Sequence, residues 1–159
     1  MQRAATLDAI DWKILGELQA DGALTNVELA RRVGLTPPPC LRRVHALQEA
    51  GYIEAYRAIL DAPRLGYSVV CFAFVHLASQ AETDLAAFQA HVAGWKTVRE
   101  CWTLSGDFDF LMKCVTEDLP SLQAFVSDLT ATPNVRNVRT ALALGKVKDE
   151  GLVPISTKP

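Results

Sequence analysis

Residues 26–50 constrain the fold more than any other part of this chain, because their start and stop signals divide them into two short helices. Thr25 can cap a helix that begins at residue 26, and Glu28, three residues after Thr25, completes the pattern of a capping box. Gly34 then ends that helix, and a second helical pattern follows after a short turn. Two helices around a tight glycine turn predict a helix-turn-helix.

The second helix has its own boundary signals and two distinct faces. Thr36 can cap it, Pro37 occupies the first position where a missing N–H costs nothing, and Gly51 ends it. At about 100° per residue, one arc collects apolar side chains and the rest points elsewhere. The apolar arc holds Cys40, Leu41, Val44 and Leu47, and the outward positions are Pro39, Arg42, Arg43, His45 and Ala46.

An outward arginine pair favours nucleic-acid binding by this helix. Arginine can read guanine through two hydrogen bonds in the major groove, or it can neutralise phosphate. The net charge of the whole chain is −2, which favours no class of partner, but residues 31–57 contain five arginines and only two glutamates. The alternative is a solvated arginine face on an ordinary helical hairpin.

The segments on either side complete a small domain, which we place at residues 1–60. Apolar side chains recur at helical spacing over residues 8–20 and predict a third helix. Residues 51–60 contain β-formers with partial alternation, and we expect one or two short strands there, forming a wing. Arg57 in this segment could contact phosphate, or it could simply be solvated.

Pro63 and Gly66 interrupt the periodic patterns, so we place a short linker at residues 61–66. A second domain follows at residues 67–147, and residues 148–159 form a tail. The second domain repeats a strand-helix-strand unit, which predicts a ferredoxin-like βαββαβ topology and an α+β protein overall. We expect strands at 69–77, 98–105, 109–116 and 135–144, and helices at 84–93 and 121–130.

Both faces of the first predicted strand are apolar. Two helices cover only one face of such a sheet, so the other face needs a further protein surface. We expect this surface to be the same sheet of a second subunit, related by a two-fold axis. One face carries Cys71, Ala73, Val75 and Leu77, and the other carries Val70, Phe72 and Phe74.

The turn at residues 105–109 is a candidate ligand site. Gly106 leaves room for a ligand to approach the backbone N–H groups, and a carboxylate of Asp107 or Asp109 can accept an ammonium group. A free amino acid would fit such a turn, with neighbouring apolar side chains contacting its side chain. The alternative is a plain hairpin whose aspartates cap their own turn.

Two long segments of the chain resemble the Lrp/AsnC family, the leucine-responsive and asparagine-responsive transcription regulators. The first is LDAIDWKILGELQADGALTNVELARRVGLTPPPCLRRVHALQEAGYIEAYRAILD, and the second is VRECWTLSGDFDFLMK at residues 98–113. The resemblance implies a regulator that binds double-stranded DNA and whose assembly responds to a small-molecule effector, an amino acid. It also implies homodimers that assemble further, commonly into octamers.

The resemblance also implies roles for individual residues. Pro38 and Ala46 depart from the small hydroxyl and basic residues that the family often has at these positions, which puts the operator preference in doubt. Ala141 is small for its position, so the effector pocket could be larger or differently shaped. The DNA-binding residues implied are Arg42 and Arg43, with Thr36, Pro38, His45 and Arg57 secondary. The effector residues implied are Leu104, Ser105, Gly106, Asp107 and Asp109, followed by Thr140, Ala141 and Leu142.

Other classes of function have weaker support. The N-terminal residues contain no apolar signal core and no apolar run is long enough to cross a bilayer, so we expect a cytoplasmic protein without a membrane partner. The four cysteines are far apart, and we interpret them as reduced core residues rather than metal ligands. We expect no metal and no cofactor. An architectural DNA-binding protein without an effector stays open, as does an enzyme using His76, Cys101 or Asp107, although no catalytic spacing unites those three residues.

Overall fold

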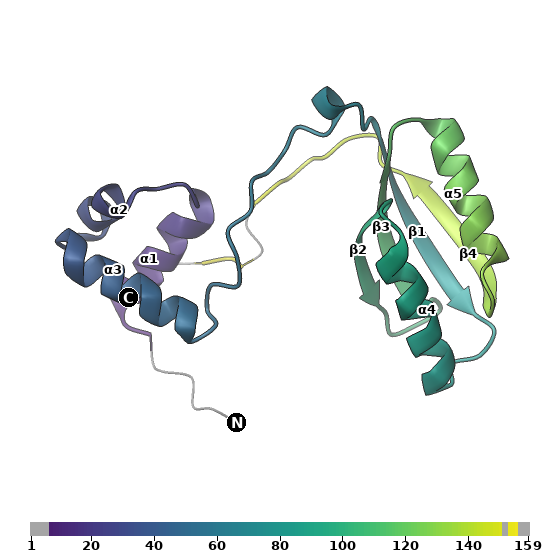
Figure 1. The fold of residues 1–159 in the computed structure, drawn as a ribbon, viewed down its shortest axis with the longest axis horizontal. Coiled ribbons are helices and arrows are strands. Elements are labelled where there is room, and N and C mark those ends of the chain that lie inside the picture. The colour runs from purple at the N-terminus through teal and green to yellow at the C-terminus, as the bar shows by residue number, and fades with distance from the viewer. Residues whose placement is uncertain (1–6, 151–152, 156–159) are drawn as a thin grey trace. The chain divides into compact units, whose positions relative to one another are not determined.

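The structure of the chain, a computed structural model, describes residues 7–150 and 153–155 (Figure 1). The chain divides into two compact units. The first comprises Met1–Ile59 together with Lys148–Pro159, and the second comprises Leu60–Val147. Of the predicted tail, residues 151–152 and 156–159 lie outside the described residues.

The first unit contains three helices, α1 (Ala9–Ala20), α2 (Asn26–Val33) and α3 (Pro37–Glu49). A complete capping box begins α1, since the side chains of Asp8 and Asp11 each accept a hydrogen bond from the backbone N–H of the other. Gly34 ends α2 with φ of +79°, a left-handed conformation that glycine adopts without strain. The predicted helices and the glycine turn are therefore confirmed.

Only half of the capping box predicted for α2 forms. Thr25 Oγ1 accepts the N–H of Glu28 at 3.2 Å, as expected for an N-cap. The Glu28 side chain does not return the bond, because its carboxylate is held by Arg31 and Arg32. Its charge therefore serves an ion-pair network rather than the end of the helix.

Thr36 stands at the N-cap position of α3, but its side chain makes no capping hydrogen bond. An N-cap oxygen accepts from the N–H of the second or third helical residue. Here these residues are Pro38 and Pro39, which have no N–H to donate. The prediction that Thr36 caps α3 through its side chain is therefore wrong.

The strands predicted after α3 do not form. Residues 53–61 adopt no regular secondary structure, and no strand in the described residues pairs with them. Ile59 and Leu60 are exposed. A lone strand cannot satisfy its backbone groups, so the alternating pattern was not sufficient without a neighbour. Tyr56 in this segment does contact the helical part of the unit, because its ring lies close to Gly22.

The second unit has the predicted βαββαβ order, and its one sheet has the strand order β2-β3-β1-β4 with antiparallel neighbours. Helices α4 and α5 cover one face of this sheet, as Figure 1 shows. A short 3-10 helix, η1 (Pro63–Leu65), precedes it. The elements are β1 (Val69–Leu77), α4 (Glu82–Gly94), β2 (Val98–Thr103), β3 (Phe110–Thr116), α5 (Leu119–Ala131) and β4 (Val135–Leu142).

The core of the second unit lies between the sheet and its helices, where Phe88 and Phe125 both pack against Trp95. The opposite face of β1 is only half-buried at Val70, Phe72 and Phe74. On that face the helices provide no cover, and the predicted apolar face is present. The fully buried strand residues on the helix side are Cys71, Ala73, Val75, Leu77, Phe110, Met112 and Cys114. Among the described residues, no helix is both long and apolar enough to cross a membrane.

Candidate DNA-binding and ligand-binding sites

Helix α3 buries one side and exposes the other, which fixes the residues it can present to a partner. Cys40, Val44 and Leu47 are buried against α1 and α2. On the opposite side, Arg42 and His45 are exposed. Pro38 precedes Arg42 by one helical turn and is exposed as well. These three side chains therefore share the outward strip of α3.

Arg43 does not belong to this strip. Its Nη1 donates to Asp8 Oδ2 at 2.8 Å and to Asp11 Oδ1 at 2.7 Å, and its side chain is 33% exposed. The hydrogen bonds to Asp11 and Asp8 raise the pKa of the Arg43 guanidinium, and the pKa of Asp8 is lowered by the backbone N–H of Asp11 and then by Arg43. Arg43 thus binds α3 to the first turn of α1, on the flank rather than the outer face.

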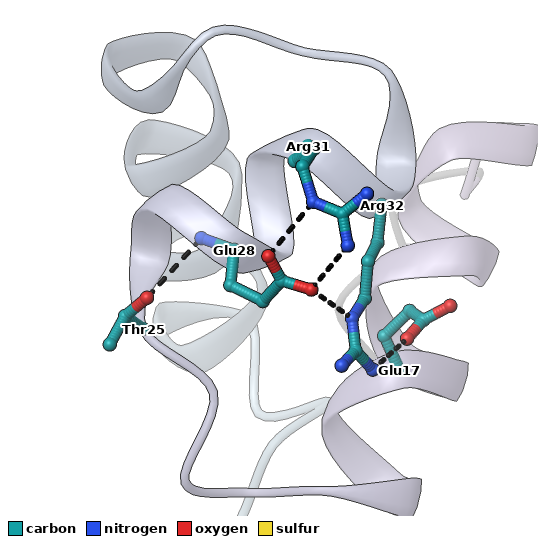
Figure 2. A network of polar contacts seen from close by, with 5 residues as sticks. All are labelled: Glu17, Thr25, Glu28, Arg31 and Arg32. Atoms are coloured by element: carbon teal, nitrogen blue, oxygen red, sulfur yellow. Dashed lines mark hydrogen bonds and ion pairs between the residues drawn. The ribbon is translucent and has the colours of Figure 1, made fainter.

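The two arginines of α2, Arg31 and Arg32, also form ion pairs, as Figure 2 shows. Glu28 accepts from Arg31 at 2.6 Å and from Arg32 at 2.9 Å, and Arg32 reaches Glu17 of α1 at 3.0 Å. Hydrogen bonds from Arg31 and Arg32 lower the pKa of Glu28 to about 2. This carboxylate therefore stays charged at neutral pH and offsets part of the local positive charge.

The N-terminus of α3 lacks the N–H groups that usually bind anions. Residues 37–39 are all proline, so the first helical N–H belongs to Cys40, and it donates to the Thr36 carbonyl at 3.3 Å. Phosphate contacts near this end must come from side chains. Thr36 is exposed and its hydroxyl is not used as a cap. Asn26 ties the two helices together, because its Nδ2 donates to the Pro37 carbonyl at 2.8 Å.

The turn between β2 and β3 combines an unusual backbone with exposed polar groups. Gly106 has φ of +136°, a conformation that side-chain-bearing residues rarely adopt. Ser105 and Asp107 are exposed beside it. The N–H of Leu104 donates to the Asp109 carbonyl at 2.9 Å and closes the turn. The geometry leaves the tip of the turn accessible to a ligand.

Asp109 has a different environment from Asp107. Asp109 is 6% exposed, and its Oδ2 accepts the Leu77 N–H while its Oδ1 accepts Gln80 Nε2, both at 2.7 Å. Nδ1 of His76 lies 3.2 Å from Oδ2, although the contact is not aligned as a hydrogen bond. Both oxygens of Asp109 are thus occupied within the fold, which leaves Asp107 as the aspartate open to an ammonium group.

The predicted effector residues of β4 do not join the turn within one subunit. Thr140 pairs opposite Ala73 of β1, whereas the carboxylate at the base of the turn bonds to Leu77, four residues further along. Four strand residues span about 13 Å. Ala141 pairs opposite Phe72, on the face that the helices leave open, and Leu142 is exposed. Thr140 instead lines a groove of about 620 Å³ beside α5, together with residues such as Leu122 and Val126.

The cysteines and histidines form no metal site among the described residues. Cys40, Cys71 and Cys114 are buried free thiols, and burial raises the pKa of Cys114 to about 12. Cys101 is exposed, which corrects the prediction that every cysteine is a core residue. Its place on an edge strand explains the difference, since only one side of β2 has a neighbouring strand.

The chain matches two protein families over separate regions. Residues 7–54 match a winged helix-turn-helix DNA-binding domain, and residues 70–153 match the Lrp/AsnC ligand binding domain. The chain belongs to the Lrp/AsnC family of transcription regulators. It is therefore a regulator with a DNA-binding domain and a ligand-binding domain, and this is not a family of enzymes.

Relatives within the Lrp/AsnC family cover nearly the whole chain. A leucine-responsive regulatory protein of Rhizobium meliloti is 57% identical over 150 residues, which are 94% of this chain and 96% of the relative. A transcriptional regulator from Neisseria meningitidis, solved with L-methionine, is 35% identical with a TM-score of 0.89 and covers 94% of this chain and 97% of its own. An AsnC family regulator from Agrobacterium tumefaciens is 33% identical with a TM-score of 0.87, over 93% of this chain and 97% of its own.

Proposed function

We propose that the chain reads its DNA sequence through the outward strip of α3, with Arg42 as the main base contact and His45 beside it. The observation that carries this proposal is the exposure of both side chains on the side of α3 opposite its buried residues. Arginine at such a position can hydrogen-bond to guanine in the major groove. Secondary DNA contacts would come from Thr36 and Pro38, which are exposed at the start of α3, and from Arg57, which is exposed in the segment after it.

Arg43 acts on DNA indirectly in this proposal. Its guanidinium is held by Asp8 and Asp11, so a direct DNA contact would require it to leave two charge-assisted hydrogen bonds. We therefore assign it the role of positioning α3 on α1. The base contacts then rest on fewer cationic side chains than the sequence suggested.

The effector is an amino acid, bound at the turn between β2 and β3. Gly106 allows close approach to the backbone, and the exposed carboxylate of Asp107 suits an α-ammonium group. The regulator from Neisseria meningitidis was solved with L-methionine, and the relative from Rhizobium meliloti is named as leucine-responsive. Leu104 and Ser105 flank the ligand, while Asp109 holds the shape of the turn.

Two copies of the ligand-binding domain assemble through the face of the sheet that the helices leave open. Phe72 and Val70 are half-buried there in the single chain, and a second copy would bury them fully. These dimers then assemble into larger oligomers, such as octamers. Such contacts between copies would bring Thr140, Ala141 and Leu142 of one subunit near the turn of another, because one subunit keeps them apart. Residues 61–66 join this domain to the DNA-binding domain.

The decisive experiment combines DNA selection with ligand binding. Genomic fragments are selected by the full-length protein, and binding is footprinted with and without each of the twenty amino acids. We expect protection at phased sites that changes with one or a few amino acids. Uniform protection that no amino acid alters would contradict the proposal and indicate an architectural DNA-binding protein. Calorimetry with L-leucine and L-methionine then measures the affinity of the turn directly.

A further inference from the structure

The tail returns to the DNA-binding domain and is held there by the side chain of one glutamine. Gln19 Nε2 donates to the Val153 carbonyl at 2.7 Å, and the Val153 N–H donates to Gln19 Oε1 at 3.1 Å. One carboxamide therefore satisfies both backbone groups of a residue that lies in no helix or strand. This arrangement resembles a single step of strand pairing and fixes the tail to the last turn of α1.

An apolar contact adds to these hydrogen bonds. Ile155 is half-buried, and a Cβ built at Gly16 would lie 3.7 Å from its Cγ2. The Ile155 side chain therefore lies over α1 at Gly16, within van der Waals reach of that position. Gly16 and Gln19 are one turn apart, so both belong to one face of α1.

We infer that the tail is a second tether between the two domains, and that the face of α1 formed by Gly16 and Gln19 is its docking surface. The chain leaves the first unit at Ile59 and re-enters it at Lys148, so two covalent connections join the units. A single short connection leaves a domain free to reorient, whereas a second connection anchored on a helix removes much of that freedom.

Helix α1 links this docking surface to the helix proposed to read DNA. Its first turn holds Arg43 of α3 through Asp11 and the N-cap Asp8, and its last turns hold the tail through Gly16 and Gln19. A helix of this length is a rigid element of about 18 Å. The docked tail is therefore attached to the same helix that positions α3.

The docking is tested by hydrogen-deuterium exchange of the full-length protein, without DNA or ligand. Gln19→Ala removes both hydrogen bonds, and Ile155→Asp removes the apolar contact without altering α1. We expect the amides of Val153 and Ile155, which flank a proline, to exchange about tenfold faster or more in either variant. Lys13→Ala, at an exposed position of the same helix, is the matched control and should leave this exchange unchanged. Equal exchange in the wild type and both tail variants would overturn the docking.

The tether is tested by small-angle X-ray scattering of the same proteins. The combined Gln19→Ala and Ile155→Asp variant should have a larger radius of gyration and a broader distribution of interatomic distances than the wild type and Lys13→Ala. Faster tail exchange with unchanged scattering would overturn the tether, because a docked tail would then restrict nothing. Neither measurement uses DNA or effector, so a negative result here is distinct from a failure of the proposed function.

Discussion

Arg43 Nη1 lies 2.7 Å from Asp11 Oδ1, and this contact fastens α3 to the first turn of α1. The Asp11 side chain is only 17% exposed, so the pair is partly shielded from water. The same aspartate completes the capping box of α1 with Asp8. The Asp11 carboxylate thus helps to begin α1 and also holds α3 in place. The angle of α3 therefore depends on a residue that precedes Arg43 by 32 positions.

Arg43→Ala should lower the stability of the DNA-binding domain together with its affinity for DNA. The change leaves two carboxylates without their cation, and we expect the free energy of unfolding to fall by about 1 kcal/mol. Thermal unfolding followed by circular dichroism measures this loss. Asp11→Asn should reproduce both effects if Arg43 acts by positioning α3. A loss of DNA affinity in Arg43→Ala with unchanged stability, and no effect in Asp11→Asn, would show that Arg43 contacts DNA directly.

Arg42→Ala should lower DNA affinity while leaving stability within about 0.5 kcal/mol, because its side chain is exposed on the outward strip. If Arg42 reads a guanine, the loss is about 1–3 kcal/mol of binding energy and falls on one base position. Fluorescence anisotropy with DNA variants at each position measures this. If Arg42 contacts phosphate instead, all sequences weaken alike and the slope of log K against log salt decreases by about 0.9.

The role of Arg43 shows where sequence reasoning reached its limit in the DNA-binding domain. Helical periodicity correctly separated the buried residues Cys40, Val44 and Leu47 from the arginines, but Leu41, placed on the same arc, is 43% exposed. It could not distinguish Arg42 from Arg43, because both lie off the apolar arc and the partner of Arg43 is in another helix. The sequence did contain one indication of a partner for Arg43. Asp8 and Asp11 have the spacing of a helix start with two acidic side chains.

The two aspartates of the β2–β3 turn should respond differently to substitution. Asp109→Ala leaves the Leu77 N–H without its acceptor, and we expect the second domain to lose about 2 kcal/mol of stability. Asp107→Ala should leave stability within about 0.5 kcal/mol and abolish the heat of amino-acid binding in calorimetry. Glu117→Ala is the control, because Glu117 is exposed. Ser79→Ala would not serve, because the Ser79 hydroxyl accepts the N–H of Ala81. Unaltered amino-acid binding by Asp107→Ala would remove this residue from the site.

The fold of the second domain could be predicted almost completely, whereas the wing could not. Alternation and helical stripes identified every strand and helix of the βαββαβ unit, because each buries an apolar side against its neighbours in the same chain. Residues 53–61 have a similar alternation, but no neighbouring strand in the described residues pairs with them. The distinction between Asp107 and Asp109 also needed three dimensions, since it depends on the backbone of Leu77, 32 residues earlier.

Glu28 should make the stability of the DNA-binding domain depend on pH in the acidic range. Its pKa is about 2 in the folded protein, below the ordinary value of 4.5. The stabilisation is therefore fully present above about pH 4.5 and is lost as the pH falls towards 2. Melting temperatures of the wild type should fall more steeply over this range than those of Glu28→Gln. The difference between the two slopes should be smaller at high salt, because salt screens the ion pairs. Parallel curves for the two proteins would contradict the prediction, and Glu49→Gln is the matched exposed control.

Phe72→Glu should convert the proposed dimer into a monomer. Phe72 is half-buried on the open face of the sheet and pairs opposite Lys113 and Ala141, so its substitution places a charge in the middle of the proposed interface. Sedimentation velocity measures the change in assembly. Leu119→Glu is the control, because Leu119 is 57% exposed at the start of α5 and lies away from this face. Phe72→Glu should keep its α+β circular dichroism spectrum, since Phe72 is not part of the core beneath the helices. If Phe72→Glu assembles like the wild type, the open face is not the dimer interface, and the effector residues of β4 must meet the turn by another contact between subunits.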